Sequence, residues 1–203
     1  MLLWDHMETI RRDIILASTS PRRKDIFSKL RIPFTIIESR YEEDMTLPMS
    51  PTNLVEHLSA RKARSVAQNH SNLNALIIGA DTVVVFENHV LGKPKTEERA
   101  REMLSMLRGK ENDIVTGVTL LDSHDQHELS FHETTKVFMK QISDETITAY
   151  IKTGEPLDKA GAYALQELGA VLIDRVEGDF FNAMGLPLAR LSEELQRFGV
   201  YIL

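Results

Sequence analysis

The run from Ala75 to Phe86 constrains the fold of this chain more than any other segment. Its valines and isoleucines favour a β-strand, and helix-like segments flank it, so we expect it to be the central strand of a sheet. Asp81 interrupts the run. Because an unpaired buried carboxylate carries a severe desolvation cost, Asp81 must meet a cation or hydrogen-bond donors. It is either a metal ligand or general base, or a cap of the strand end or of a nearby turn, and this feature alone favours neither role.

The remaining segments alternate between strand-like and helix-like patterns, with two consecutive strands in the middle joined by a polar tip. This order predicts a mixed-sheet α/β domain. At roughly 100 to 200 residues per domain, the chain of 203 residues is one domain. We assign 1–12 to an N-terminal extension and 13–203 to the domain. Helices are predicted at 21–30, 51–68, 97–108, 143–153 and 186–198, strands at 13–18, 33–38, 90–91, 113–121, 129–139 and 171–176, and a loop at 155–166.

Charge and composition exclude several classes of protein. The formal net charge is −6, which disfavours a nucleic-acid binder with a basic surface. With no cysteine, the chain forms no disulfide, thiolate nucleophile, cysteine-based zinc site or iron–sulfur cluster. The longest apolar runs are far shorter than the ~18 residues of a membrane span, and residues 1–12 do not resemble a signal peptide. We therefore expect a cytoplasmic protein without stable nucleic-acid or membrane partners.

A basic turn marks a candidate anion site. The stretch from Arg11 to Arg31 holds seven basic and two acidic side chains, a net charge of +5 within a chain of −6. Within it, 18–23 joins a predicted strand to a helix start, where free backbone N–H groups favour an anion and Arg22 and Arg23 add forked donors. The alternative is a solvated basic helix face.

Two lysines are further candidates. Lys62 falls inside the apolar arc of its predicted helix, so its ammonium group either reaches the rim of the sheet or meets a ligand. If it meets a phosphate, we expect Lys62→Met to keep or gain stability while losing activity. Lys93 lies in the turn after the hairpin of the Asp81 strand, and we expect it to face the same end of the sheet as Asp81.

Other candidate motifs are weak or missing. Three histidines and two aspartates between Asp122 and His132 resemble a metal cluster on paper, but they span a polar hairpin tip and we do not expect zinc there. The patterns GxxxxGKS, GxGxxG and GxSxG do not occur, which excludes a P-loop, a Rossmann dinucleotide site and a serine-hydrolase elbow.

Several short blocks, taken together and in order, closely resemble the Maf family of nucleoside triphosphate pyrophosphatases. The resemblance runs from about Asp13 to Phe198, and the DKAGAY block with Gln166 is similar to the branch that acts on dTTP and UTP rather than on 7-methyl-GTP. The blocks are LASTSPRR at 16–23, KA at 62–63, GADTV at 79–83, LGKP at 91–94, TGV at 116–118, DKAGAY at 158–163, EGD at 177–179, Asn182 and GLP at 185–187.

The resemblance implies a fold, a reaction and an assembly. The fold is an elongated mixed sheet flanked by helices, with two lobes and a central cleft, as in inosine triphosphate pyrophosphatases. The reaction is metal-dependent hydrolysis of dTTP and UTP, and of modified pyrimidine triphosphates as candidate substrates, to the monophosphate and pyrophosphate in a house-cleaning role. Oxygen ligands suit Mg²⁺, with Mn²⁺ as the alternative. Members of the family are often dimers, so a homodimer is a candidate assembly.

The resemblance also implies roles for single residues. Asp81 is the proton acceptor, and the catalytic set includes Lys62 and Lys93. The metal carboxylates are Asp81 and Glu43, although Glu42 and Asp44 are adjacent alternatives to Glu43. The triphosphate is held by Ser18 and Arg23, and base preference is set by Arg22, Thr82 and Gln166. Glu167 stands where the family usually has glycine.

A second hypothesis from a different class is a nucleotide-responsive regulator of cell division, because Maf proteins are associated with septum formation. In that case nucleotide binding rather than turnover would carry the function. The presence of Asp81 among the cationic residues Lys62 and Lys93 favours an enzyme, since a pure sensor needs no base among its phosphate-binding groups.

Overall fold

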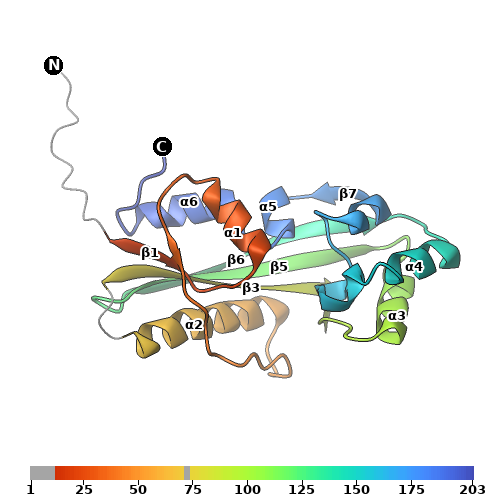
Figure 1. The fold of residues 1–203 in the computed structure, drawn as a ribbon, viewed down its shortest axis with the longest axis horizontal. Coiled ribbons are helices and arrows are strands. Elements are labelled where there is room, and N and C mark those ends of the chain that lie inside the picture. Colours follow the sequence, from red (N-terminus) through yellow and green to blue (C-terminus); the bar gives the residue numbers. More distant parts are fainter. Residues whose placement is uncertain (1–11, 71–73) are drawn as a thin grey trace, which may run out of the picture.

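The computed structural model describes residues 12–70 and 74–203, and it contains one mixed β-sheet flanked by helices (Figure 1). The expected α/β class is therefore confirmed. Of the predicted extension, residues 1–11 lie outside the described part of the chain. The strands are β1 (Asp13–Leu16), β2 (Thr35–Ile36), β3 (Ala75–Phe86), β4 (His89–Leu91), β5 (Glu111–Asp122), β6 (Glu128–Met139) and β7 (Ile173–Glu177). The α-helices are α1 (Pro21–Ser28), α2 (Pro51–Asn69), α3 (Glu97–Leu107), α4 (Asp144–Ile151), α5 (Phe180–Ala183) and α6 (Leu188–Gln196).

The pairing of β3 leaves a gap in the sheet. One edge of β3 pairs antiparallel with β5 from Leu76 to Val85. The other edge pairs in parallel with β1 only up to Ile78, and antiparallel with β4 only from Val84 onward. In the part of the chain that the structure describes, no strand pairs with residues 79–83 on this edge. The loops that follow β1 and β4 therefore both open beside Asp81, and the gap is the place where a ligand can approach the central strand.

Helix α2 covers one face of the sheet, and two glycines let it lie close to the strands (Figure 1). A Cβ atom on Gly79 would lie 2.2 Å from the carbonyl oxygen of Ser59, and one on Gly117 would lie 2.3 Å from the backbone of Val55. Both helical residues are buried. A side chain larger than hydrogen at either glycine would push α2 away from β3 and β5, and would displace whatever α2 presents to the gap.

The opposite face carries two separate apolar clusters, one at each end of the sheet. Helices α1 and α6 pack over the first cluster, which includes Leu76, Ile78 and Ala80 of β3. Helices α3 and α4 pack over the second, which includes Val84 and Phe86. Thr82 lies between these two sets on β3. The two lobes expected from the sequence are these two clusters, and they meet above the gap.

The observed elements differ from the predicted ones most clearly in four places. The strand predicted at 33–38 is reduced to β2, and the one predicted at 171–176 begins only at Ile173, because 168–172 form the 3₁₀ segment η3 (Leu168–Leu172). The predicted loop at 155–166 contains two 3₁₀ segments, η1 (Glu155–Asp158) and η2 (Ala160–Ala162). Helix α5 is too short to show a periodic pattern, and Asp179 caps it by accepting from the amides of Phe181 and Asn182.

Among the described residues, no helix has the length and apolar character needed to cross a membrane.

Candidate active site

Asp81, Lys62 and Glu43 form a cluster at the gap. The ammonium nitrogen of Lys62 lies 2.5 Å from Oδ1 of Asp81 and 2.6 Å from Oε1 of Glu43. Both Lys62 and Asp81 are buried, at 8% and 5% exposure. Asp81 therefore meets a cation, as its buried position required. Lys62 extends from α2 to two carboxylates at the gap and not to the rim of the sheet. Of the three adjacent acidic residues, Glu43 reaches the cluster, whereas Asp44 accepts hydrogen bonds from Thr46.

The two carboxylates of this cluster differ in their affinity for a proton. Burial raises the pKa of Asp81 above its ordinary value of 3.8, although the charges of Lys62 and Arg23 act against the rise. Burial also acts to raise the pKa of Glu43, but here the charge and hydrogen bond of Lys62 outweigh it, and the pKa falls below 4.5. Asp81 is thus the better proton acceptor of the pair, and Glu43 is the more firmly ionised group.

Arg23 approaches the same gap from the opposite face of the sheet. Its Nε donates to the carbonyl oxygen of Gly185 at 2.9 Å, and its Nη2 donates to Oγ1 of Thr82 at 2.9 Å. Oγ1 of Thr82 also lies 3.0 Å from Oγ1 of Thr116, its directly opposed neighbour on β5. These contacts fix the guanidinium group at the start of α1, where Ser20 caps the helix by accepting from the amide of Arg23.

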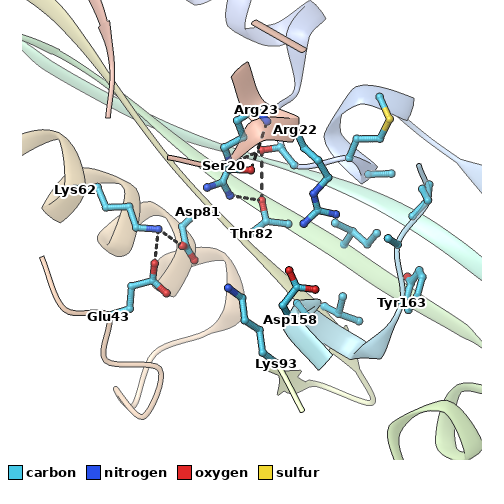
Figure 2. Close-up of a pocket in the computed structure, with 18 residues that line it drawn as sticks. Ser20, Arg22, Arg23, Glu43, Lys62, Asp81, Thr82, Lys93, Asp158 and Tyr163 are labelled. Carbon is cyan, nitrogen blue, oxygen red and sulfur yellow. Dashed lines mark hydrogen bonds and ion pairs between the residues drawn. The ribbon is translucent and has the colours of Figure 1, made fainter. Parts of the chain in front are cut away.

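Two adjoining cavities open at the gap, and Figure 2 shows the first. The inner cavity lies between the two lobes and has an apolar wall that includes Val84, Ile114 and Leu165. The outer cavity lies along the turn from β1 to α1, with Ser18, Thr19 and Tyr41 in its lining. Residues common to both are Ser20, Arg22, Arg23, Glu43, Lys62, Lys93 and Asp158.

The charges around the inner cavity favour an anion. Its lining carries four cationic side chains and three carboxylates, a net charge of +1 in a chain of net charge −6. Arg22 and Lys93 both point into this space in Figure 2. The two cavities suit an elongated ligand whose apolar end packs against the inner wall and whose polyanionic end meets the shared cations.

All of the site residues predicted from the sequence except Gln166 line one or both of these cavities. Ser18 lines the outer cavity and its Oγ accepts from the amide of Ser20 at 3.3 Å. Gln166 is exposed and lies outside the lining of both cavities, although Leu165 lines the inner one and Glu167 the outer one. The base-recognition role of Gln166 therefore stays a prediction.

Sequence reasoning assigned no role to three residues of the site. Asp158, Lys159 and Tyr163 line the cavities, and the DKAGAY block that contains them was the available signal. The described residues contain no group of three or more histidine, aspartate or glutamate side chains that could hold a metal ion. His132 instead contacts Glu56 through Nδ1 at 2.7 Å.

The donor set at the gap fits a hard divalent cation that the ligand helps to bind. The ion pairs with Lys62 bring the carboxylates of Asp81 and Glu43 together, and these two residues would hold the cation. Two carboxylates are too few for a dedicated protein cage. Mg²⁺ is commonly bound through one or two carboxylates, with substrate phosphates and water completing the shell.

Comparison with known proteins found a matching family model, similar sequences and a solved structure that aligns in part. A family model described as Maf-like protein matches residues 13–198. A dTTP/UTP pyrophosphatase of Methanosarcina mazei is 50% identical over 94% of this chain and 96% of the relative. A dTTP/UTP pyrophosphatase of Lachnoclostridium phytofermentans is 45% identical over 92% and 95%. Among solved structures, the Ham1 protein of Staphylococcus aureus aligns with a TM-score of 0.46 and 15% identity over 64% of this chain and 73% of that chain.

Proposed function

Because the chain belongs to the family of Maf-like proteins, we propose that it is a metal-dependent nucleoside triphosphate pyrophosphatase acting on dTTP and UTP. The products are a nucleoside monophosphate and pyrophosphate. The observation that carries the proposal is the gap beside β3, where a buried carboxylate of raised pKa lies among cationic side chains that come from both faces of the sheet. House-cleaning of aberrant pyrimidine triphosphates, a cytoplasmic location and a homodimer remain predictions from the sequence.

The polyphosphate is bound by the cations that the two cavities share. Arg22 and Arg23 offer forked donors, and Lys62 and Lys93 add point charges. As the bond between the α- and β-phosphates breaks, negative charge grows on the leaving pyrophosphate, and cations already fixed in position stabilise it without reorganising. Two hydrogen bonds orient Arg23, and two ion pairs hold Lys62.

The nucleophile is a water molecule that gives its proton to Asp81. A carboxylate with a raised pKa takes that proton more readily than an ordinary aspartate does. Lys62 holds Asp81 and Glu43 in place and opposes protonation of Asp81 before the substrate arrives. A bound Mg²⁺, held by Asp81 and Glu43, would supply charge neutralisation of the phosphates.

The nucleoside lies in the inner cavity. Its apolar wall suits the face of a pyrimidine ring, and Thr82 and Arg22 supply polar groups at its edge. Gln166 directly follows Leu165 of this wall, and its amide carries both a donor and an acceptor. That pair matches the O4 and N3–H edge of uracil and thymine, whereas cytosine presents the reverse pattern.

Substrate preference tests the proposal. With Mg²⁺, we expect turnover of dTTP and UTP to exceed that of CTP and 7-methyl-GTP, because a site built for one hydrogen-bond pattern rejects a ligand that leaves its groups unpaired. Gln166→Glu replaces the amide donor with an acceptor that faces O4, so kcat/KM for dTTP should fall with little change in thermal stability. Steady-state kinetics on the four nucleotides measure both effects.

Two outcomes would contradict this account. A marked preference for 7-methyl-GTP would refute the assignment to the dTTP/UTP branch while leaving the chemistry intact. Tight binding of dTTP without turnover would favour the regulator hypothesis over the enzyme. The matched control for Gln166→Glu is Gln126→Glu at the hairpin tip, where the amide only donates to the carbonyl of Ser123, and it should keep the kinetics of the wild type.

A further inference from the structure

The carboxylate of Glu155 binds three donors that come from two other segments. Its Oε1 accepts from the hydroxyl of Tyr150 at 2.8 Å and from the amide of Gly169 at 2.9 Å. Its Oε2 accepts from the amide of Leu168 at 3.0 Å. Tyr150 lies on α4, and the two amides begin η3. One side chain thus connects α4, η1 and η3.

Glu155 supplies the cap that η3 lacks locally. The first amides of a helical segment have no partner within that segment and need an outside acceptor. Glu167 occupies the capping position of η3 but its side chain makes no capping hydrogen bond. The carboxylate of Glu155, distant in sequence, fills that role. Burial raises the pKa of Tyr150 above its ordinary value of 10.0, so its hydroxyl stays a neutral donor to Glu155 at any working pH.

The residues just before η3 form the wall of the nucleotide site. Tyr163 and Leu165 line the inner cavity, and Glu167 lines the outer one. We call residues 163–167 the wall segment. At its start, the hydroxyl of Tyr163 donates to Oδ1 of Asn112 at 2.7 Å. At its end, the contacts to Glu155 hold the backbone. The wall segment is therefore fixed at both ends, and Gln166 lies within it.

Gly169 packs tightly against Ala164 and Tyr150, so a movement of η3 would also move the wall segment. A Cβ atom at Gly169 would lie 2.6 Å from both the carbonyl oxygen of Ala164 and the hydroxyl of Tyr150. With so little space, a shift of the first turn of η3 must move the backbone at Ala164, which lines the inner cavity.

We propose that Glu155 is a positioning residue for pyrimidine recognition, whose carboxylate fixes the wall segment through the amides of Leu168 and Gly169 without touching the nucleotide. The inference rests on the proposed function and deepens it. Glu155 acts on the nucleoside end of the substrate only, because the cations that bind the polyphosphate come from α1, α2 and the turn after β4.

Glu155→Gln tests this role. A glutamine presents one acceptor and one NH₂ group, so at least one of the two amides of η3 must lose its partner. We expect KM for dTTP to rise about tenfold, which corresponds to the energy of one lost hydrogen bond to a charged group. The preference for dTTP over CTP should fall by a similar factor. We expect kcat to stay within about twofold, and inhibition by pyrophosphate to be unchanged, since the phosphate end keeps its contacts.

Two further variants sharpen the test. Tyr150→Phe removes one donor and leaves both amides bound, so its KM should change in the same direction by a smaller factor, and this variant serves if Glu155→Gln fails to fold. Glu128→Gln is the matched control, because it removes the same charge from an ion pair with Arg64 outside both cavities. It should keep the KM and the nucleotide preference of the wild type.

An amide-exchange measurement by NMR gives a readout that does not depend on activity. The amides of Leu168 and Gly169 should exchange faster in Glu155→Gln than in the wild type. Unchanged exchange at both amides would overturn the proposal, and so would faster exchange accompanied by unchanged KM and preference. If the wild-type protein hydrolysed neither dTTP nor UTP, the proposed function would be refuted, and with it the recognition role of Glu155. The amide exchange rates would still show whether Glu155 anchors η3.

Discussion

Replacing Asp81 by asparagine is expected to lower kcat at least ~100-fold while leaving the protein folded. Asparagine keeps the shape of the side chain, and its Oδ1 can still accept from Lys62, but it cannot take a proton from water. Lys62 keeps Glu43 as its charged partner 2.6 Å away, and the buried position loses a charge whose desolvation is costly, so stability should hold. Turnover of dTTP with Mg²⁺ and thermal unfolding of the same preparation measure the two effects.

The matched control for this variant is Asp125→Asn. Asp125 lies at the exposed hairpin tip between β5 and β6, where its Oδ1 accepts from the amide of His127. Asparagine offers the same acceptor, so both activity and stability should match the wild type. If Asp81→Asn also turned over dTTP at the wild-type rate, Asp81 would be a structural partner of Lys62 and the base would have to be sought elsewhere.

Lys62→Met is expected to lose both activity and stability. The methionine keeps most of the stem packing, but Asp81 loses the cation 2.5 Å away and Glu43 loses its partner as well. Removal of one member of a buried pair typically costs about 3–5 kcal/mol in the free energy of unfolding. Turnover should fall about 100-fold or more, because a preorganised cation near the phosphates is lost.

The loss of stability in Lys62→Met should depend on pH. In metal-free buffer, burial holds the pKa of Asp81 in the folded protein above its unfolded value, and without Lys62 the difference grows. The folded state then binds the proton more tightly, so the variant regains stability as the pH falls and loses it as the pH rises through that pKa. The double variant Lys62→Met with Asp81→Asn should recover most of the lost stability. Equal stability of Lys62→Met and wild type at pH 8 would contradict the account.

The sequence alone led to the opposite expectation for the stability of Lys62→Met. The helical arc showed that the ammonium group had to leave the apolar face, and the isolated Asp81 showed that a cation was needed. Each signal was read correctly by itself. The pairing of Lys62 with Asp81 could not be predicted, because it depends on how closely α2 lies on β3. Gly79 and Gly117 set that distance through backbone contacts with residues far away in the sequence.

The larger elements were predictable because their patterns are long. Strand β3 was predicted with the bounds it has, and α2 within one residue, since branched runs and apolar periodicity extend over many positions. The gap beside β3 was not predictable, because it arises from where β1 ends and β4 begins on the same edge. Residues 171–172 were misassigned to a strand because they are apolar, whereas in the structure they end η3, whose first amides donate to Glu155.

The site followed the same division. The turn at 18–23 and Lys93 were singled out because cations lie near the end of a predicted strand, and Lys62 because it falls inside the apolar arc of its helix. Glu43 was assigned only by resemblance; it lies 2.6 Å from Lys62, and its role as a metal ligand stays a prediction. Lys159 was missed because its burial, at 8% exposure, arises only in the folded chain, where its ammonium nitrogen pairs with Asp158 and lies 3.8 Å from Glu167. A lone lysine in a polar stretch carries no such signal in the sequence.

The most direct test of the central claim is the identity of the first products of dTTP hydrolysis, followed by phosphorus NMR in the presence of Mg²⁺. We predict dTMP and pyrophosphate in equal amounts from the earliest time point, no turnover after chelation of the metal, and accumulation of both products at least ~100-fold slower with Asp81→Asn. Orthophosphate and dTDP as first products would contradict it, because they would place the cleaved bond between the β- and γ-phosphates.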